Sequence, residues 1–227
     1  PVVVADLGDR NLSEMIPIRG KLIPDYFMSG NKILDIKGEE YPIMSLEEYL
    51  FESTRWGRMK FIRTNKMEFD SFMDMHPEII TKLKQTRKTV LILESFNKNP
   101  MAELRAFFLA LETHIWKVPV IIYRKYEEDV LEDLQIKAAG DLGCLFLDGY
   151  GDGICVSNIS ENITFIELKD LGFGILQASR MRVSKTEFVS CPGCGRTLFN
   201  LHDTTLKIKE HFKHLDHLKI GIMGCVV

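Results

Sequence analysis

The sequence predicts an α/β protein with two domains, a large one over residues 1–178 and a small one over residues 179–227. The first reason is a repeat: strand-like apolar runs begin near residues 60, 89, 118 and 143, about every 25–29 residues. Repetition of a strand and a helix is typical of a parallel sheet. The second reason is that the C-terminal residues are organised differently, around a Cys-Pro-Gly-Cys-Gly segment in a strand-helix-strand unit.

The elements of the large domain are predicted from short apolar runs bounded by turn residues. The expected strands are residues 2–7, 60–64, 89–94, 118–123 and 144–147. The expected helices are residues 77–84, a helix that begins at Asn99-Pro100 with its apolar side chains on one face, and residues 127–139, ended by Gly140. Residues 10–56 are rich in Pro and Gly, and only Ser45 to Glu48 offers a capping box for a helix, so this region is expected to be an insertion or an edge decoration.

Composition excludes several classes of protein. Of 227 residues, 45% are apolar and 27% charged, which indicates a folded domain, and a net charge of −3 gives no general sign of a nucleic-acid or membrane partner. No apolar run reaches the ~18 residues of a membrane helix. Five cysteines, an odd number, favour a reducing compartment over a disulfide framework. The chain opens in a strand-like run without Met, and we expect it to be a fragment.

Three cysteines in the small domain predict a metal centre. Cys191 and Cys194 are separated by two residues, so both thiolates of one tight turn can face one metal. Cys225 comes after a predicted strand over 218–223, which is preceded by a helix over 203–215 and a first strand at 188–190. Three thiolates without a fourth cysteine fit a [4Fe–4S] cluster with one other ligand better than a closed zinc site.

The residues alone leave a zinc site open. Its fourth ligand would be one of four histidines, His202, His211, His214 or His217. The apolar stripe of the predicted helix places His211 and His214 at its flanks, so they are expected on the surface.

Other candidate residues have structural interpretations. Cys144 and Cys155 are expected to be buried and inert. The Gly-Tyr-Gly-Asp-Gly segment from Gly149 to Gly153 has the glycines of a phosphate loop, but the residues after it have the pattern of a strand, so a structural turn is expected. A basic cluster, Arg180, Arg182 and Lys185, precedes the cysteines, either as linker charge or as a contact for phosphate.

A resemblance to the 4-hydroxy-3-methylbut-2-enyl diphosphate synthase family (GcpE/IspG) rests on two stretches, Thr186-Glu-Phe-Val-Ser-Cys-Pro-Gly-Cys-Gly-Arg-Thr-Leu-Phe-Asn200 and Lys219-Ile-Gly-Ile-Met-Gly-Cys-Val-Val227. The iron–sulfur domain of that family holds a [4Fe–4S] cluster by three cysteines and one glutamate. The resemblance implies that Cys191, Cys194 and Cys225 are the cysteine ligands and that the glutamate lies beyond Val227.

The resemblance also implies a fold. The repeat by itself allows either part of a (β/α)₈ barrel or an open doubly wound sheet. Long forms of the family resemble a catalytic barrel, then a second barrel-like insert, then the iron–sulfur domain. Residues 1–178 would be a partial TIM-barrel-like insert, incomplete at its N-terminus, and residues 179–227 the iron–sulfur domain, incomplete at its C-terminus. The Gly149 to Gly153 segment resembles a Gly-Asp segment of the catalytic barrel.

The function implied by this resemblance is that of an oxidoreductase of isoprenoid (terpenoid) biosynthesis, in the methylerythritol phosphate route. It would reduce a small cyclic diphosphate, 2-C-methyl-D-erythritol 2,4-cyclodiphosphate, with electrons from ferredoxin or flavodoxin. Arg180, Arg182 and Lys185 would contact the diphosphate, and the fragment alone, which holds no catalytic residue, would be inactive. The expected location is the cytoplasm of a bacterium, or a plastid or apicoplast stroma. A homodimer is compatible with this interpretation.

A non-enzymatic alternative remains at this point. The chain would then be a barrel-derived spacer with a zinc or iron–sulfur knuckle that serves binding or assembly.

Overall fold

The computed structural model of the protein describes residues 1–8, 22–51, 59–78, 81, 88–114, 116–212, 214–215 and 218–225. The chain divides into two compact units, Pro1–Met181 and Arg182–Val227. The sequence predicts a boundary after residue 178. In the structure the boundary lies a few residues later, after Met181. Each unit is described by itself below.

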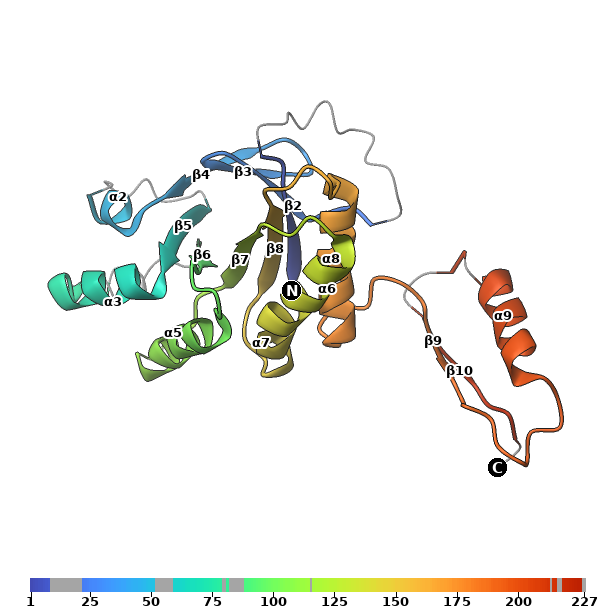
Figure 1. Cartoon of the computed structure of the whole chain (residues 1–227). Coiled ribbons are helices and arrows are strands. Elements are labelled where there is room, and N and C mark those ends of the chain that lie inside the picture. The colour runs from blue at the N-terminus through green and yellow to red at the C-terminus, as the bar shows by residue number, and fades with distance from the viewer. Residues whose placement is uncertain are drawn as a thin grey trace. The chain divides into compact units, whose positions relative to one another are not determined.

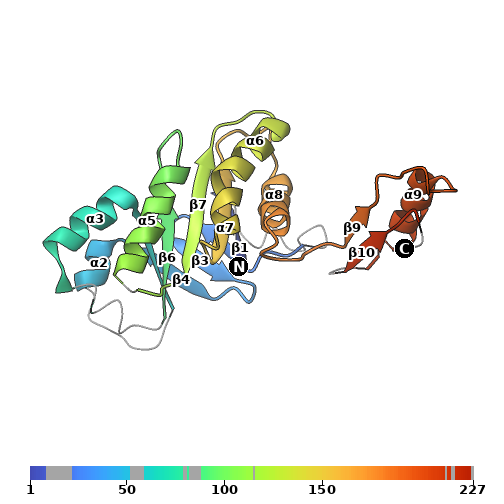
Figure 2. The same cartoon turned by 90° about the horizontal axis from the view of Figure 1, so that it is seen from below.

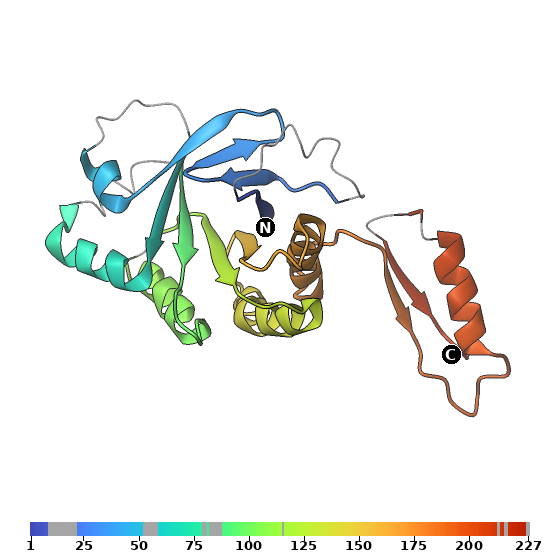
Figure 3. The ribbon, with the colours of Figure 1, turned by 45° about the horizontal axis from the view of Figure 1, so that its top comes forward.

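In the part of the chain that the structure describes, eight strands close into a barrel, because the last strand pairs with the first. The strands are β1 (Val2–Asp6), β2 (Tyr26–Ser29), β3 (Lys32–Asp35), β4 (Glu40–Met44), β5 (Lys60–Asn65), β6 (Thr89–Glu94), β7 (Val120–Tyr126) and β8 (Gly153–Asn158), as Figures 1 and 3 show. An open doubly wound sheet would reverse its order near Val90, but β5, β6 and β7 are successive neighbours. The predicted TIM-barrel-like fold class is therefore confirmed.

The first part of the barrel wall is antiparallel. β2 pairs with β3 and β3 with β4 in antiparallel register, whereas the other pairs are parallel. Gly30 and Asn31 make the first turn, and the Asp35 carboxylate accepts backbone N–H groups in the second. The prediction that residues 10–56 are an insertion or edge decoration is therefore wrong for residues 26–44, which build the wall. The α/β alternation is incomplete there, because no helix separates these three strands.

Helices lie along the outside of the parallel part of the barrel, as Figure 2 shows. They are α2 (Leu46–Phe51), α3 (Lys66–Met75), α5 (Met101–Thr113), α6 (Leu131–Ala138), the π-helix η1 (Ala139–Gly143), α7 (Cys144–Leu147) and α8 (Phe165–Ala178). Successive side chains of a strand alternate between two cores. On β5, Phe61 packs inside the barrel and Ile62 packs against the helices. Cys155 lies in the inner core, 1% exposed, and burial raises the pKa of its thiol, so the expectation that this cysteine is buried is confirmed.

Two helices begin at reciprocal caps. The Ser45 hydroxyl accepts the Glu48 N–H at 3.1 Å while the Glu48 carboxylate accepts the Ser45 N–H at 2.8 Å, which confirms the predicted capping box of α2. Thr164 and Glu167 form the same pair at the start of α8. The predicted helix over residues 77–84 lies largely outside the described residues.

The predicted strand at residues 144–147 is wrong, because these residues form the helix α7. Gly140 does not end the preceding helix, and the chain continues from α6 through η1 into α7. Four apolar residues in a row do not distinguish a strand from a buried helical turn. Cys144 is accordingly half-buried on a helix, not buried in a strand.

The helix ends instead just before Gly149, which has a φ of 84°. The N–H groups of Gly149 and Tyr150 return to the carbonyls of Phe146 and Leu145, as expected for a left-handed helix end. This end belongs to the Gly149 to Gly153 segment, which leads directly into β8.

The same segment ties three strands together. The Asp152 carboxylate accepts the Val120 N–H at 3.0 Å, and the Asp152 carbonyl accepts the Val2 N–H at 2.8 Å. These bonds join the amino ends of β7, β1 and β8, where the barrel closes. The expectation of a structural turn is confirmed.

The second unit is a strand-helix-strand unit, as predicted. It consists of β9 (Glu187–Ser190), α9 (Leu201–Phe212) and β10 (Lys219–Ile222). The two strands pair in parallel, with Ser190 opposite Ile222. Leu201 and Thr205 are buried on the helix, and the Thr205 hydroxyl lies 3.2 Å from the Ser190 hydroxyl of β9.

Candidate functional site

The three cysteines of the small unit lie just after the ends of its two strands. Cys191 comes directly after β9, and its N–H donates to the Ile222 carbonyl of β10 at 2.9 Å. Cys225 lies three residues beyond Ile222 on the other strand. Because the strands are parallel, both cysteines lie at the same edge of the sheet.

Thr197 connects the turn that holds Cys191 and Cys194, called the knuckle below, to the segment that contains Cys225. The Cys194 N–H donates to the Thr197 hydroxyl at 3.3 Å, and the Thr197 N–H donates to the Cys194 carbonyl at 2.9 Å. Gly224 lies against the same side chain, because a Cβ on Gly224 would stand 2.5 Å from the Thr197 hydroxyl oxygen. Gly224, the residue before Cys225, and the backbone of Cys194 therefore both contact Thr197.

The chemistry of this edge is that of thiol ligands. All three cysteines are free thiols, Cys194 exposed and the other two half-buried. Gly193 permits the turn between Cys191 and Cys194, since its φ is 84°. Among the described residues no group of three or more Cys, His, Asp or Glu is arranged so that it could hold a metal ion. Their role as cluster ligands therefore stays a prediction.

The histidines that a zinc site would need lie on the surface. His202 and His211 are exposed on α9, and His214 is exposed just after it. The expectation of surface positions for His211 and His214 is confirmed, and His217 lies outside the described residues.

The basic cluster is divided between the two units. Arg180 is exposed at the end of the first unit, and the half-buried Arg182 and the exposed Lys185 belong to the second. Among the described residues, Arg180 is the only one other than glycine with a positive φ, 61°. Contact of these three side chains with a substrate stays a prediction.

A second polar site, at the carboxyl end of the barrel, was not predicted. Arg63 of β5 pairs with Glu94 of β6 through Nε at 2.8 Å and Nη2 at 2.7 Å. Its guanidinium carbon lies 4.7 Å from the ring centre of Tyr123, whose hydroxyl lies 3.5 Å from Asp6 Oδ2. Burial, more than any nearby charge, raises the pKa of Tyr123 to about 12, so that the phenol stays protonated.

These side chains extend the inward face of the strands by one position. Arg63 is two residues beyond the inward Phe61, and Glu94 is two residues beyond the inward Ile92. On both strands an inward apolar residue is followed, two positions later, by a charged one. This pattern on successive strands is the sequence signal that could have revealed the polar site.

In the described part of the chain, no helix combines the length and the apolar character that crossing a bilayer requires.

Comparison with known proteins places these observations in a family. A family profile described as the GcpE protein C-terminal domain matches residues 187–227, which include all three cysteines. The chain is 39% identical over its whole length to the 4-hydroxy-3-methylbut-2-en-1-yl diphosphate synthase (flavodoxin) of Bacteroides fragilis, of which it spans 37%. It is 44% identical over 154 residues to the protein of the same name from Porphyromonas gingivalis, covering 68% of this chain and 26% of that protein.

A plant protein belongs to the same group of relatives. The 4-hydroxy-3-methylbut-2-en-1-yl diphosphate synthase (ferredoxin), chloroplastic, of Oryza sativa subsp. japonica is 43% identical over 124 residues, 54% of this chain and 16% of that protein. The chain thus spans little more than a third of the first bacterial relatives that it matches. It belongs to the 4-hydroxy-3-methylbut-2-en-1-yl diphosphate synthase (GcpE) family, and it corresponds to part of the length of those members.

Proposed function

We propose that the chain supplies the iron–sulfur module of a 4-hydroxy-3-methylbut-2-enyl diphosphate synthase, together with the barrel that precedes it. The observation that carries the proposal is the position of Cys191, Cys194 and Cys225. They are free thiols at one edge of a parallel strand pair, inside the segment that matches the C-terminal domain of the family. Thiolates are the usual ligands of iron–sulfur clusters, so these three would hold a [4Fe–4S] cluster.

The surrounding backbone would fix the ligands. Thr197 holds the knuckle by two hydrogen bonds and contacts Gly224, so it would set the distance between the knuckle and Cys225. The fourth ligand would be a carboxylate, as the family resemblance implies. When bound, the cluster would supply one-electron transfers to the substrate.

The proposed reaction is the reduction of 2-C-methyl-D-erythritol 2,4-cyclodiphosphate to 4-hydroxy-3-methylbut-2-enyl diphosphate. The names of the relatives mention flavodoxin in Bacteroides and ferredoxin in rice. One of these two small electron carriers is therefore proposed as the donor for this protein.

The basic cluster is proposed to bind the diphosphate of the substrate. Arg180 and Lys185 are exposed, and guanidinium and ammonium groups suit phosphate oxygens. In the whole enzyme, Arg180→Ala or Arg182→Ala should raise KM roughly ten- to hundredfold and leave the iron content unchanged. Wild-type kinetics in both variants would mean that the arginines are only linker charge.

The experiment that tests the cluster is anaerobic reconstitution with iron and sulfide. We expect about four irons per chain and absorption near ~400 nm, lost in Cys191→Ser, Cys194→Ser and Cys225→Ser. Cys144→Ser is the matched control, because Cys144 is half-buried on α7 of the other unit and should not affect the iron content. A colourless protein with about one zinc per chain would contradict the proposal and favour a non-enzymatic knuckle.

A further inference from the structure

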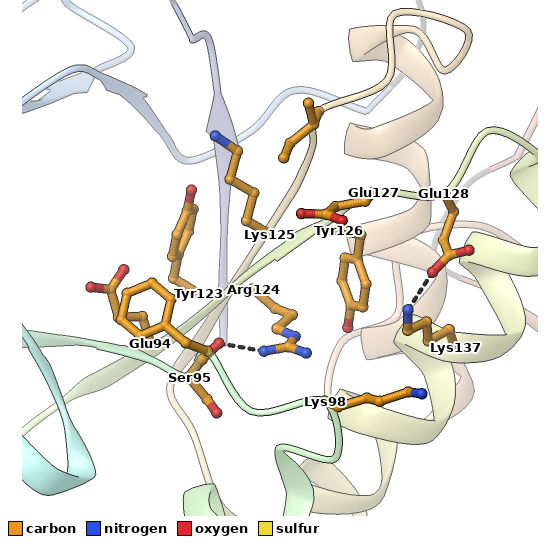
Figure 4. Close-up of a pocket in the computed structure, with 12 residues that line it drawn as sticks. Glu94, Ser95, Lys98, Tyr123, Arg124, Lys125, Tyr126, Glu127, Glu128 and Lys137 are labelled. Atoms are coloured by element: carbon orange, nitrogen blue, oxygen red, sulfur yellow. Dashed lines mark hydrogen bonds and ion pairs between the residues drawn. The ribbon is translucent and has the colours of Figure 1, made fainter.

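The carboxyl ends of β6, β7 and β8 border a cavity of about 540 Å³, shown in Figure 4. Cavities of roughly 300–1,000 Å³ hold small molecules, and the carboxyl ends of barrel strands are where such folds bind them. Twelve residues line it: Glu94, Ser95, Phe96, Lys98, Tyr123, Arg124, Lys125, Tyr126, Glu127, Glu128, Lys137 and Ile159. The cavity lies wholly within the first unit, and none of the cysteine ligands proposed above takes part in it.

Side chains hold the walls of the cavity in place. The Asn158 side chain of β8 donates to the Glu128 carbonyl at 2.8 Å and accepts the Glu128 N–H at 3.2 Å. The Arg124 guanidinium of β7 donates to the carbonyls of Ser95 and Asn97, as Figure 4 shows for Ser95. These bonds join the segments that follow β6, β7 and β8. The cavity is therefore formed in advance, and a ligand does not have to order its walls.

Two opposite charges lie on one side of the end of β7. Tyr123 packs inside the barrel and Tyr126 packs against the helices, so alternation places Lys125 on the inward side. Glu127 follows two residues later, about 7 Å along an extended chain. Figure 4 shows the side chains of both above that of Arg124 in the view. Both are exposed, and within the described part of the chain neither side chain has a hydrogen bond or an ion pair.

An exposed apolar side chain of β8 stands beside this pair. Ser157 is the register partner of Lys125, so Ile159, two residues beyond Ser157, comes opposite Glu127. The Ile159 N–H donates to the Tyr126 carbonyl at 2.9 Å, which holds it against the end of β7. Its side chain is 57% exposed and lines the cavity.

A second apolar side chain lies on the other neighbour of β7. Glu94 of β6 is the register partner of Tyr123, and Phe96 comes two residues beyond Glu94. Phe96 is 79% exposed and lines the same cavity as Ile159. The two charges of β7 are thus flanked by an aromatic residue after β6 and an aliphatic residue after β8.

The other cations of the lining do not belong to this group. Figure 4 shows Lys98 below Arg124 in the view, whereas Lys125 lies above it. Lys137 is paired with Glu128. A ligand on the inward side therefore meets one unpaired cation and one unpaired carboxylate.

We propose that the cavity binds a small zwitterion with an apolar side chain, that is, a free α-amino acid. Its carboxylate contacts Lys125, its ammonium contacts Glu127, and its side chain lies against Phe96 and Ile159. An ion of a single sign would leave one of the two charges unmatched, and a wholly polar ligand would leave the apolar residues uncovered. The site is separate from the cysteine site, so it does not depend on the proposed function.

The test is calorimetric titration of the full chain with L-phenylalanine at low ionic strength. We expect saturable binding, weakened about fivefold by Lys125→Gln and about fivefold by Glu127→Gln, the upper range for an exposed ion pair. Glycine, which has no side chain, should bind at least tenfold more weakly than phenylalanine. Both substituted residues are exposed, so the variants should keep the fold.

Two analogues assign each charge to its partner. N-acetylphenylalanine lacks the ammonium, and phenylalanine amide lacks the carboxylate. Because the ligand group that Lys125 contacts is already missing, Lys125→Gln should leave the affinity for phenylalanine amide unchanged. By the same reasoning, Glu127→Gln should leave the affinity for N-acetylphenylalanine unchanged. The opposite pairing of variants and analogues would overturn the assignment.

Lys37→Gln is the matched control. Lys37 is an exposed lysine of the same unit, in the turn that precedes β4, and this variant carries the same change of charge as Lys125→Gln. It should leave phenylalanine binding unchanged. The proposal is overturned if the wild-type chain does not bind phenylalanine, if Lys37→Gln weakens binding as much as Lys125→Gln does, or if glycine binds as tightly as phenylalanine.

Discussion

Gly151 takes a conformation and a space that no larger residue can take without displacing its neighbours. Its φ is +90°, and a Cβ would stand 2.8 Å from Ile122 Cδ1 and 3.0 Å from Phe146 Cε1. We expect Gly151→Ala to lower the free energy of unfolding by about 2–4 kcal/mol, from the left-handed strain together with overpacking. Urea unfolding measures the change.

Gly174 is the control for that prediction. It lies in α8, it is exposed, and nothing stands within 4 Å of where its Cβ would be. Gly174→Ala should raise the free energy of unfolding by about 0.5–1 kcal/mol, because alanine favours the helix. Equal effects of the two substitutions would show that space and φ do not decide the role of Gly151.

Arg180 sits where many helices place a glycine. Its φ is 61°, and its N–H and that of Met181 return to the carbonyls of Gln177 and Leu176 at the end of α8. Arg180→Gly should therefore stabilise the chain by about 1 kcal/mol, whereas Arg180→Ala keeps the strained conformation and should not. Thermal unfolding of the two variants compares them. A less stable glycine variant would mean that the arginine side chain itself holds this end of the helix.

At the scale of the element, α8 depends on its first turn. The Thr164 hydroxyl accepts the Glu167 N–H at 3.3 Å, and the Glu167 carboxylate accepts the Thr164 N–H at 2.8 Å. We expect Thr164→Ala to cost about 1 kcal/mol of unfolding free energy, since an N-cap is lost. Thr164→Ser keeps a hydroxyl and should retain most of the stability in the same urea experiment.

The same cap makes part of the stability depend on pH. Hydrogen bonds from Thr164 lower the pKa of Glu167 below its ordinary value of 4.5. A group with a lowered folded pKa stabilises the protein above its unfolded pKa and loses that contribution as the pH falls through the folded value. Between pH ~6 and pH ~3, the stability of Glu167→Gln should therefore fall less than that of the wild type. Parallel curves for the two proteins would exclude Glu167 as a source of the pH dependence.

Some elements could be predicted from local sequence, and others depended on the fold. β6, Thr-Val-Leu-Ile-Leu-Glu, is an apolar run with β-branched residues, so the local pattern was sufficient there. The hairpin of β2 and β3 carried a signal in Gly30-Asn31 but was obscured by the prolines and glycines around it. The residues of α7 are a short apolar run, and only the continuation from η1 decides that they are helical.

At the scale of the whole molecule, the two candidate sites differ in how far sequence reveals them. Cys191 and Cys194 lie in one turn, and Cys225 follows the partner strand β10. Their spacing in the sequence therefore predicts that all three lie at the same edge of the small sheet. The polar site at the carboxyl end of the barrel joins Arg63 of β5 to Glu94 of β6 and Tyr123 of β7. No spacing rule places those side chains around one space until the barrel has closed.

The two units have separate cores among the described residues. The buried clusters of the barrel draw on residues up to Leu176, whereas Leu201 and Ile222 are buried in the small unit. Separate cores predict that a local defect in one unit leaves the stability of the other unchanged.

Asp152 and Ser190 offer a reciprocal test of that independence. Asp152→Ala removes the acceptor of the Val120 N–H, so hydrogen exchange should become about fivefold faster in β1, β7 and β8, as a loss of about 1 kcal/mol implies, and stay unchanged in β9 and β10. Ser190→Ala removes the contact of its hydroxyl with Thr205 at 3.2 Å and should affect only β9 and β10. If either substitution accelerates exchange in both units to the same extent, the chain unfolds as one cooperative structure, and the separation of its cores has no energetic consequence.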